Sequence, residues 1–305
     1  IATGAPLPPG ADAVVMVERC ARAGTDVRVH EPVRPGQNVG RRANDLAAGA
    51  PVVSRGDWLS PARLGALAAT GVTEVTVYAR PVVALASTGD ELVAPGAPLG
   101  PGQIHDVNRF TLPAVVLAHG GEVHHLPSVP DDEAAISRAL EAAPAADLVV
   151  FTGGSSVGDR DLVTAVVAAR GEMLFHGVAM KPGKPTMLAR VRRPGADAQL
   201  VLGLSGNPTS CLANAYLLLV PMLRALARLP AWRPQRLTAR LALDLAARDD
   251  RHQFYPVRLE GDTAVAAFKG SGEITSLSRA DGYIEIPAGT ERVPAGTEVT
   301  VTLFH

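Results

Sequence analysis

The sequence predicts a multidomain α/β chain in three parts: a β-rich N-terminal region, a central three-layer α/β domain with a mostly parallel sheet, and a small C-terminal all-β barrel. Short alternating runs rich in Pro, Gly and Val fill the first 57 residues. Apolar strand-like runs alternate with helix-like segments between residues 81 and 229. After residue 230 only strand-like runs separated by glycines follow. Strands alternating with helices are typical of a parallel sheet covered on both faces.

We place the domain boundaries where these patterns change. The expected parts are a partial β-rich domain over residues 1–40, a partial linker region over 41–80, the α/β domain over 81–229 and the barrel over 230–305. A chain of 305 residues is long enough for two or three domains.

Within the N-terminal parts, alternating apolar residues predict strands at residues 13–17 and 26–29, with no helix before residue 58. One helix has clear boundary signals, because Ser60 is suited to the N-cap, Pro61 to the first helical position and Gly71 to the stop. We expect a strand over Val72–Tyr78 after it.

The central part has the strongest periodicity. Thr111 is expected to cap a helix over residues 112–119, which puts Pro113 in its first turn. The loop around residues 193–196 is interpreted as a surface insertion. The other expected elements are strands at 82–86, 122–126, 148–151, 173–179 and 199–204, helices at 132–143 and 162–169, a long helix after residue 210 with a kink at Pro221, and barrel strands at 237–245, 254–260, 264–268, 283–286 and 298–303.

Composition excludes several classes of function. The 29 basic residues nearly balance 30 acidic ones, so no basic surface for nucleic acid or an anionic membrane is expected. Aromatic residues make up 4%, which argues against base stacking. No apolar run approaches a membrane span, and two cysteines indicate reduced thiols in a cytoplasmic protein. The first residues carry no initiator Met and no signal pattern, so we expect an upstream part to be missing.

The stretch from Asp147 to Asp161 is the most unusual in the chain. A buried apolar strand, Leu148 to Phe151, runs into glycines interleaved with hydroxyls and then into a helix. Such a turn presents free backbone N–H groups to an anion such as phosphate. Asp159 and Asp161 would repel an anion, so we expect a cation beside them.

Three further clusters follow other predicted strands. Ser87–Glu91 precedes Asp106 and Asn108, Asp131 and Asp132 form a pair, and Lys181 and Lys184 flank a Pro-Gly turn. Carboxylates at converging strand ends suit a hard cation such as Mg²⁺, and two lysines three residues apart can face one oxyanion. Simpler interpretations stay open, because an aspartate can cap the next helix and the lysines can form a solvated turn.

These motifs resemble the MoeA/gephyrin family of molybdopterin molybdenumtransferases. The matching runs occur in order from Ile1 to the last strand: Thr3–Pro6, Gly36–Asn38, Ser87–Glu91, Thr152–Asp161, Met180–Pro185, Gly203–Pro208, Arg251–Phe254, Gly270–Gly272 and Ser278–Gly282. The resemblance implies a central domain of the molybdopterin-binding type. It also implies an enzyme that inserts molybdate into adenylylated molybdopterin and releases AMP, with Mg²⁺ as cofactor.

The resemblance also implies a role for individual residues. The molybdate pocket would be formed by Ser156, Lys181, Lys184, Pro185, Arg251 and Ser271. The pterin and its phosphate would contact Thr3, Gly153, Gly154, Ser155, Asn207, Pro208, Thr209 and Ser210. Catalytic roles would fall to Asp161, Glu91, Asp45 and Asp131 or Asp132, and the metal to Asp161, Glu91 and Asp90.

The family further implies a homodimer, with residues 41–80 in dimerisation, and the molybdopterin adenylyltransferase as a candidate partner. Two alternatives remain: adenylylation of molybdopterin, and a non-catalytic binding or scaffold protein like gephyrin. The chain departs from the family pattern at three places. It begins after an upstream Ser-x-x-Asp-Gly-Tyr-Ala motif, Ser205 replaces a usual proline, and Gly177 replaces a common basic residue, for which His176 is a substitute.

Overall fold

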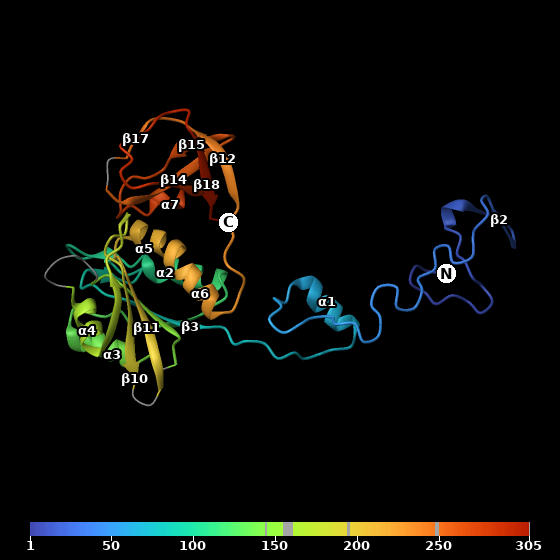
Figure 1. The fold of residues 1–305 in the computed structure, drawn as a ribbon, viewed down its shortest axis with the longest axis horizontal. Helices are drawn as coiled ribbons and strands as arrows, with labels where there is room; N and C mark the ends of the chain where they lie inside the picture. Colours follow the sequence, from blue (N-terminus) through green and yellow to red (C-terminus); the bar gives the residue numbers. More distant parts are fainter. Residues whose placement is uncertain (144, 155–160, 194–195, 248–249, 305) are drawn as a thin grey trace. The chain divides into compact units, whose positions relative to one another are not determined.

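The computed structural model describes residues 1–143, 145–154, 161–193, 196–247 and 250–304. The chain divides into two compact units, Ile1–Val75 and Thr76–His305. The second unit holds the α/β part and the barrel (Figure 1).

The first unit contains a short 3₁₀ turn η1 (Val17–Arg19), the hairpin β1 (Cys20–Ala23) and β2 (Asp26–Val29), and one helix, α1 (Pro61–Ala69). The helix prediction is confirmed: the Ser60 hydroxyl accepts from the Arg63 N–H at 3.3 Å, and Pro61 is the first helical residue. The strand expected at 13–17 is wrong, because that run ends in η1.

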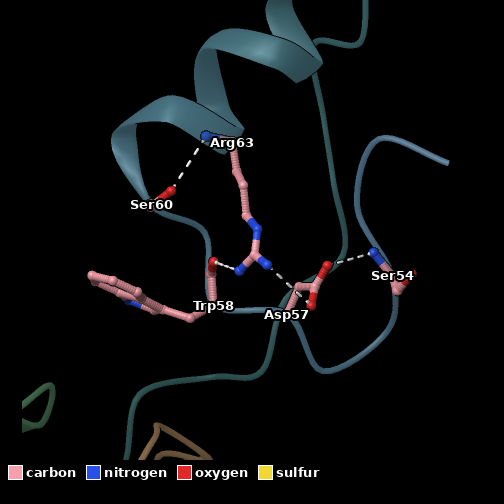
Figure 2. Close-up of polar contacts among 5 residues, drawn as sticks. All are labelled: Ser54, Asp57, Trp58, Ser60 and Arg63. Atoms are coloured by element: carbon pink, nitrogen blue, oxygen red, sulfur yellow. Dashed lines mark hydrogen bonds and ion pairs between the residues drawn. The ribbon is translucent and has the colours of Figure 1, made fainter. Parts of the chain in front are cut away.

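A polar network holds the segment that leads into α1 (Figure 2). The Arg63 guanidinium donates to the Trp58 carbonyl at 2.7 Å and lies 3.5 Å from the Asp57 carboxylate. The same carboxylate accepts from the Ser54 N–H at 2.8 Å. These bonds fix the backbone at Trp58, whose side chain is exposed.

The strand expected over Val72–Tyr78 is wrong as well. These residues form no sheet pairing and all are exposed. An apolar alternation stabilises a strand only where a second strand accepts its backbone hydrogen bonds, and no such neighbour is present among the described residues of this segment.

The second unit is built on a six-stranded sheet of order β6-β3-β7-β11-β10-β8. Its strands are β3 (Val82–Ser87), β6 (Glu122–His125), β7 (Leu148–Thr152), β8 (Gly171–His176), β10 (Met187–Arg193) and β11 (Ala196–Leu204). The four strands from β6 to β11 run parallel, whereas β10 and β8 are antiparallel to their neighbours. The mostly parallel sheet is therefore confirmed.

Helices cover both faces of this sheet (Figure 1). Helices α3 (Glu133–Glu141) and α4 (Leu162–Arg170) pack on one face. The other face is covered by α2 (Asn108–Ala118) and by a long helix made of α5 (Pro208–Asn214), the π-helical turn η2 (Ala215–Leu219) and α6 (Val220–Leu226). The π turn lies next to Pro221, whose missing N–H disturbs the regular ladder.

Three expectations for this unit need correction. Helix α2 begins at Asn108 rather than Leu112, because the Asp106 carboxylate accepts from the Arg109 N–H at 3.0 Å and starts the helix earlier. Thr111 is therefore inside the helix and does not cap it. The strand expected at 173–179 ends at His176, where Gly177 turns the chain at φ +87°.

One long strand of the central sheet was not expected. Residues Met187–Arg193 form β10, which pairs with both β11 and β8. The segment interpreted as a surface insertion thus connects the two strands of a β10–β11 hairpin, and residues 194 and 195 lie outside the described part of the chain.

The C-terminal part forms a closed barrel of order β14-β15-β12-β18-β16-β14, as expected. Its strands are β12 (Arg236–Leu241), β14 (His252–Glu260), β15 (Thr263–Ala266), β16 (Gly282–Ile286) and β18 (Glu298–Leu303). Two short pairs, β13 (Leu245–Ala246) with β17 (Arg292–Val293) and β4 (Leu92–Val93) with β5 (Ile104–His105), accompany these sheets. A single helical turn, α7 (Thr275–Ser278), interrupts the all-β pattern that was expected.

Aromatic rings join the barrel to the long helix. The ring of Phe304 in the C-terminal segment lies 4.9 Å from Tyr216 of the helix and 5.8 Å from Tyr283 of the barrel. Phe254 stacks on Tyr283 at 4.1 Å. Such offset and tilted pairs add to the burial of apolar surface, so they stabilise the barrel against the α/β part.

The long helix bears on the expectation about membranes. With 19 residues from Pro208 to Leu226, it is long and apolar enough to cross a membrane, which corrects the expectation that no run approaches a span. Its residues Leu219, Val220 and Leu223 are fully buried against the sheet. This helix therefore serves here as a core helix.

Candidate functional site

Three strand ends meet at Gly153. An added Cβ at this position would lie 2.3 Å from the Thr88 carbonyl oxygen, and the Cβ of a substituted Gly206 would lie 3.2 Å from the Gly153 Cα. Backbone bonds join the same loops, because Thr88 N donates to Thr152 O at 2.8 Å and Gly153 N to Leu204 O at 3.1 Å. Gly153 and Gly154 have φ values of +89° and +59°, which favour glycine. The turns after β3, β7 and β11 thus pack backbone against backbone.

The glycine-rich turn after β7 is described only at its two ends. Ser155 and Ser156, expected at the pterin phosphate and at molybdate, lie outside the described residues, as does Asp159. The described ends of the turn, Gly154 and Asp161, lie at the carboxyl edge of the parallel strands, where ligands bind in open α/β sheets.

A cluster of carboxylates lies beside this junction. The Asp131 N–H donates to Asp90 Oδ1 at 3.3 Å. The Glu91 carboxylate lies against Gly89, since a Cβ added to Gly89 would be 2.6 Å from Glu91 Oε2. Burial, and then the negative charges of Asp90 and Glu91, raise the pKa of Asp131. These three side chains therefore concentrate negative charge at the ends of β3 and β6.

The structure distinguishes Asp131 from Asp132. The Asp132 carboxylate caps α3, since its Oδ2 accepts from the Ala135 N–H at 2.8 Å. The Asp131 backbone N–H instead donates to Asp90 Oδ1, and the pKa of its carboxyl is raised by burial and then by the charges of Asp90 and Glu91. Asp131 is therefore the member of the pair that lies with the other carboxylates, and Asp132 is a helix cap in this structure.

Asp161 is the N-cap of α4. Its Oδ1 accepts from the Thr164 N–H at 2.9 Å and its Oδ2 from the Thr164 hydroxyl at 2.7 Å. The His176 Nε2 lies 3.3 Å from Oδ2, and the Asp161 side chain is only 10% exposed. Among the described residues, no group of three or more His, Cys, Asp or Glu side chains is arranged to hold a metal ion.

The lysine loop, defined as residues 177–186, is fixed from two sides. Val178 N and Thr186 N both donate to the Lys184 carbonyl, at 3.0 and 2.9 Å. The buried Asn214 of α5 donates to the Gly183 carbonyl at 2.8 Å. This backbone framework leaves Lys184 exposed, Lys181 and Pro185 half-buried, and Pro182 between them buried.

The lysine loop also joins the barrel. Its short strand β9 (Met180–Lys181) pairs in parallel with His252 and Gln253 of β14. The pairing brings Lys181 from the α/β part close in register to Arg251, which immediately precedes β14. Lys181 and Arg251, two of the cationic residues expected at molybdate, therefore lie on paired backbone segments of two different domains, with Lys181 opposite Gln253.

The first residues of α5 are hydrogen-bonded to the barrel loop that carries Ser271. Asn207 Nδ2 donates to Ser271 Oγ at 3.2 Å, and the Thr209 N–H donates to the Ser271 carbonyl at 3.0 Å. The Thr209 hydroxyl donates to the Glu273 carbonyl at 2.9 Å, and both Thr209 and Ser210 are buried. In this structure Thr209 bonds barrel carbonyls, at the position where phosphate contact was expected.

The remaining expected residues are Pro208, Thr3 and Asp45. Pro208 is the first residue of α5. Thr3 and Asp45 are exposed residues of the first unit. There, an open cavity of about 630 Å³ is lined by residues that flank Asp45, including Arg42 and Leu46.

Sequence reasoning missed several supporting side chains. As a functional residue, His176 was considered only as a substitute for a missing basic residue, and Thr164 and Asn214 were not considered. Asn108, singled out without a role, donates to the Gly206 carbonyl at 2.8 Å. A Thr three residues after a capping Asp is a usable signal for Thr164, whereas the other contacts join segments far apart in the sequence.

Comparisons with known proteins match the whole chain. Family models for the MoeA N-terminal region (domain I and II), a probable molybdopterin binding domain and the MoeA C-terminal region (domain IV) match residues 1–71, 84–225 and 238–304. The crystal structure of a molybdopterin biosynthesis moeA protein from Pyrococcus horikosii is similar, with a TM-score of 0.78 and 39% identity over 98% of this chain and 73% of that one.

Curated relatives agree with these models. A molybdopterin molybdenumtransferase of Haemophilus influenzae is 35% identical over 100% of this chain and 76% of its own length. Molybdopterin molybdenumtransferase 2 of Mycobacterium tuberculosis is 35% identical over 99% of this chain and 76% of its own length. The chain therefore belongs to the MoeA family of molybdopterin molybdenumtransferases.

Proposed function

We propose that this protein acts in molybdenum cofactor biosynthesis by inserting molybdate into adenylylated molybdopterin, with release of AMP. The observation that carries the proposal is the pairing of β9 with β14, which places Lys181 opposite Gln253, two residues from Arg251 of the other domain. Two cations presented at one place suit a small divalent oxyanion such as molybdate. Family membership supplies the class of reaction.

The residues at the strand ends would hold the rest of the substrate. The glycine-rich turn after β7 begins at Gly153 and Gly154, at the carboxyl edge of the parallel strands, where the phosphates of a ligand would bind. Lys184, which is exposed, would stabilise the negative charge of the incoming oxyanion. Attack of a water molecule on the phosphoanhydride then breaks its P–O bond, which releases AMP and leaves the phosphate of the pterin in place.

We further propose Mg²⁺ as the cofactor, because the donor chemistry fits it. Asp90 and Glu91, two of the expected metal ligands, carry oxygen donors of the kind that Mg²⁺ prefers, and the backbone N–H of Asp131 donates to Asp90 beside them. Mg²⁺ commonly uses one or two carboxylates together with substrate phosphates. Bound there, it would neutralise charge on the phosphates of the substrate.

A homodimer is also part of the proposal. Within residues 1–75, all of them described, Leu67 is the only side chain that is buried. Exposed apolar side chains in this segment include Met16, Val17, Trp58 and Leu64. A segment with so little core needs a partner surface, and a second copy would provide it. Light scattering coupled to size exclusion should give twice the chain mass, and a monomeric mass would contradict the dimer.

We propose a cytoplasmic location and, as one further candidate partner, the molybdopterin adenylyltransferase that would deliver the adenylylated substrate. A pull-down between the two purified proteins tests the second point. Direct transfer predicts faster insertion when both enzymes are present than when free adenylylated molybdopterin is supplied at the same concentration.

One assay separates the proposed reaction from its alternatives. The protein is incubated with adenylylated molybdopterin, molybdate and Mg²⁺, and AMP is measured by chromatography. Molybdate-dependent AMP release supports the transferase. Adenylate formed from molybdopterin and ATP alone would instead identify an adenylyltransferase, and binding of molybdopterin without either product would identify a non-catalytic binding protein.

A further inference from the structure

His176 lies between Asp161, a residue expected to be catalytic, and the lysine loop, which the proposed reaction uses to bind molybdate. It is the last residue of the edge strand β8, and its side chain is 37% exposed. Its Nε2 lies 3.3 Å from Asp161 Oδ2, which is at ion-pair distance. Nothing in the proposed reaction so far requires this contact.

Among the described residues, the other side-chain contacts of Asp161 come from its own helix. Thr164 donates to both carboxylate oxygens of Asp161, through its N–H at 2.9 Å and its hydroxyl at 2.7 Å. Thr164 therefore orients the carboxylate relative to α4 only. His176 belongs to a different element, so it fixes the same carboxylate relative to the sheet.

His176 also leads directly into the lysine loop. Gly177 N donates to the Thr186 carbonyl at 2.8 Å, and Val178 N donates to the Lys184 carbonyl at 3.0 Å. Because of these bonds, a displacement of His176 would also displace the backbone of the lysine loop. The distance between the Asp161 carboxylate and the lysine-bearing backbone thus depends on the His176 contact.

We propose that His176 is a positioning residue that holds the Asp161 carboxylate in register with the lysine loop. The inference rests on the proposed molybdenum insertion and specifies which residue keeps the Asp161 carboxylate and the lysines at a fixed separation. Chemistry between two bound groups is sensitive to displacements near 1 Å. Loss of such an orienting partner typically lowers affinity or activity about tenfold to a hundredfold.

The test compares three substitutions of His176. Glutamine can place an amide N–H near the position of Nε2, asparagine is too short to do so, and alanine has no donor. We expect kcat for molybdate-dependent AMP release to fall about tenfold or more in His176→Ala and His176→Asn, with His176→Gln recovering most of it. The KM for adenylylated molybdopterin should change less than kcat, since the substrate contacts themselves remain.

The matched control is His124→Gln on β6, an exposed histidine on the opposite edge strand of the same sheet. It should retain the kcat of the unmodified protein. Thermal unfolding of all four variants detects a purely structural role. Equal loss of stability and activity in the Gln, Asn and Ala variants, or unchanged kcat in His176→Ala, would overturn the inference. An unmodified protein without molybdate-dependent activity would instead refute the proposed function.

Discussion

The junction of strand ends can be tested by adding one methyl group to Gly153. In Gly153→Ala the new Cβ would lie 2.3 Å from the Thr88 carbonyl oxygen and 2.9 Å from the Thr88 hydroxyl. Backbone cannot move aside as a flexible side chain can, so the loops after β3 and β7 must separate. Gly153 also has φ +89°, a conformation that costs a non-glycine residue on the order of 1–2 kcal/mol.

Gly96→Ala isolates the steric part of this effect. Gly96 has φ +93°, close to that of Gly153, but nothing lies within 4 Å of its added Cβ. It should therefore show only the conformational cost of about 1–2 kcal/mol. Overpacking should add about 1–3 kcal/mol in Gly153→Ala, giving a total of roughly 2–5 kcal/mol.

Urea denaturation followed by circular dichroism measures both variants against the unmodified protein. The expected result is a larger loss of unfolding free energy for Gly153→Ala, together with loss of molybdate-dependent AMP release in that variant alone. Equal losses of stability in the two variants would refute the claim that the strand-end loops are in backbone contact at Gly153.

Further outcomes follow from the same geometry. Asp132→Ala should lose about 0.5–2 kcal/mol of unfolding free energy, because it removes an N-cap. Asp131→Asn should not destabilise the fold, but it should raise the Mg²⁺ concentration needed for half-maximal AMP release. The reverse pattern would contradict the roles assigned to the two residues. Because the pKa of Asp131 is raised in the folded state, the folded protein binds the proton more tightly. Stability from this group should therefore fall as pH rises from the unfolded pKa through the folded one. The difference in melting temperature between the unmodified protein and Asp131→Asn should therefore shift against the unmodified protein as pH rises across that acidic range. A difference that does not change with pH would contradict the close placement of Asp131, Asp90 and Glu91. Lys181→Met and Lys184→Met should each raise the KM for molybdate about tenfold or more, which is the loss of one charged hydrogen bond; unchanged KM values in steady-state assays would remove the lysines from the oxyanion site.

Local patterns in the sequence were sufficient for most of the fold. The apolar runs at Val82 and Leu148 became the buried central strands, and Ser60 with Pro61 marked the start of α1. Errors occurred where a distant partner decides the outcome. Val72–Tyr78 alternates like a strand but has no pairing partner, and Met187–Arg193 forms a strand because β8 and β11 lie on either side of it.

For the candidate site as well, local patterns were predictable and contacts between distant segments were not. Residue type and spacing identified the lysines, Asp161 and the carboxylates, because each cluster is contiguous in the chain. Their mutual arrangement could not be read this way. The choice between Asp131 and Asp132 depends on how α3 meets the Asp90 turn, and the contact of His176 with Asp161 depends on how β8 packs beside α4.

The central claim is that one site couples molybdate to the release of AMP from adenylylated molybdopterin. The most direct measurement is the initial rate of AMP release with purified protein and Mg²⁺, in the presence and absence of molybdate. We expect a rate of AMP release that saturates with molybdate and falls sharply in Lys181→Met. AMP release that is absent, or that proceeds at the same rate without molybdate and in Lys181→Met, would contradict the central claim.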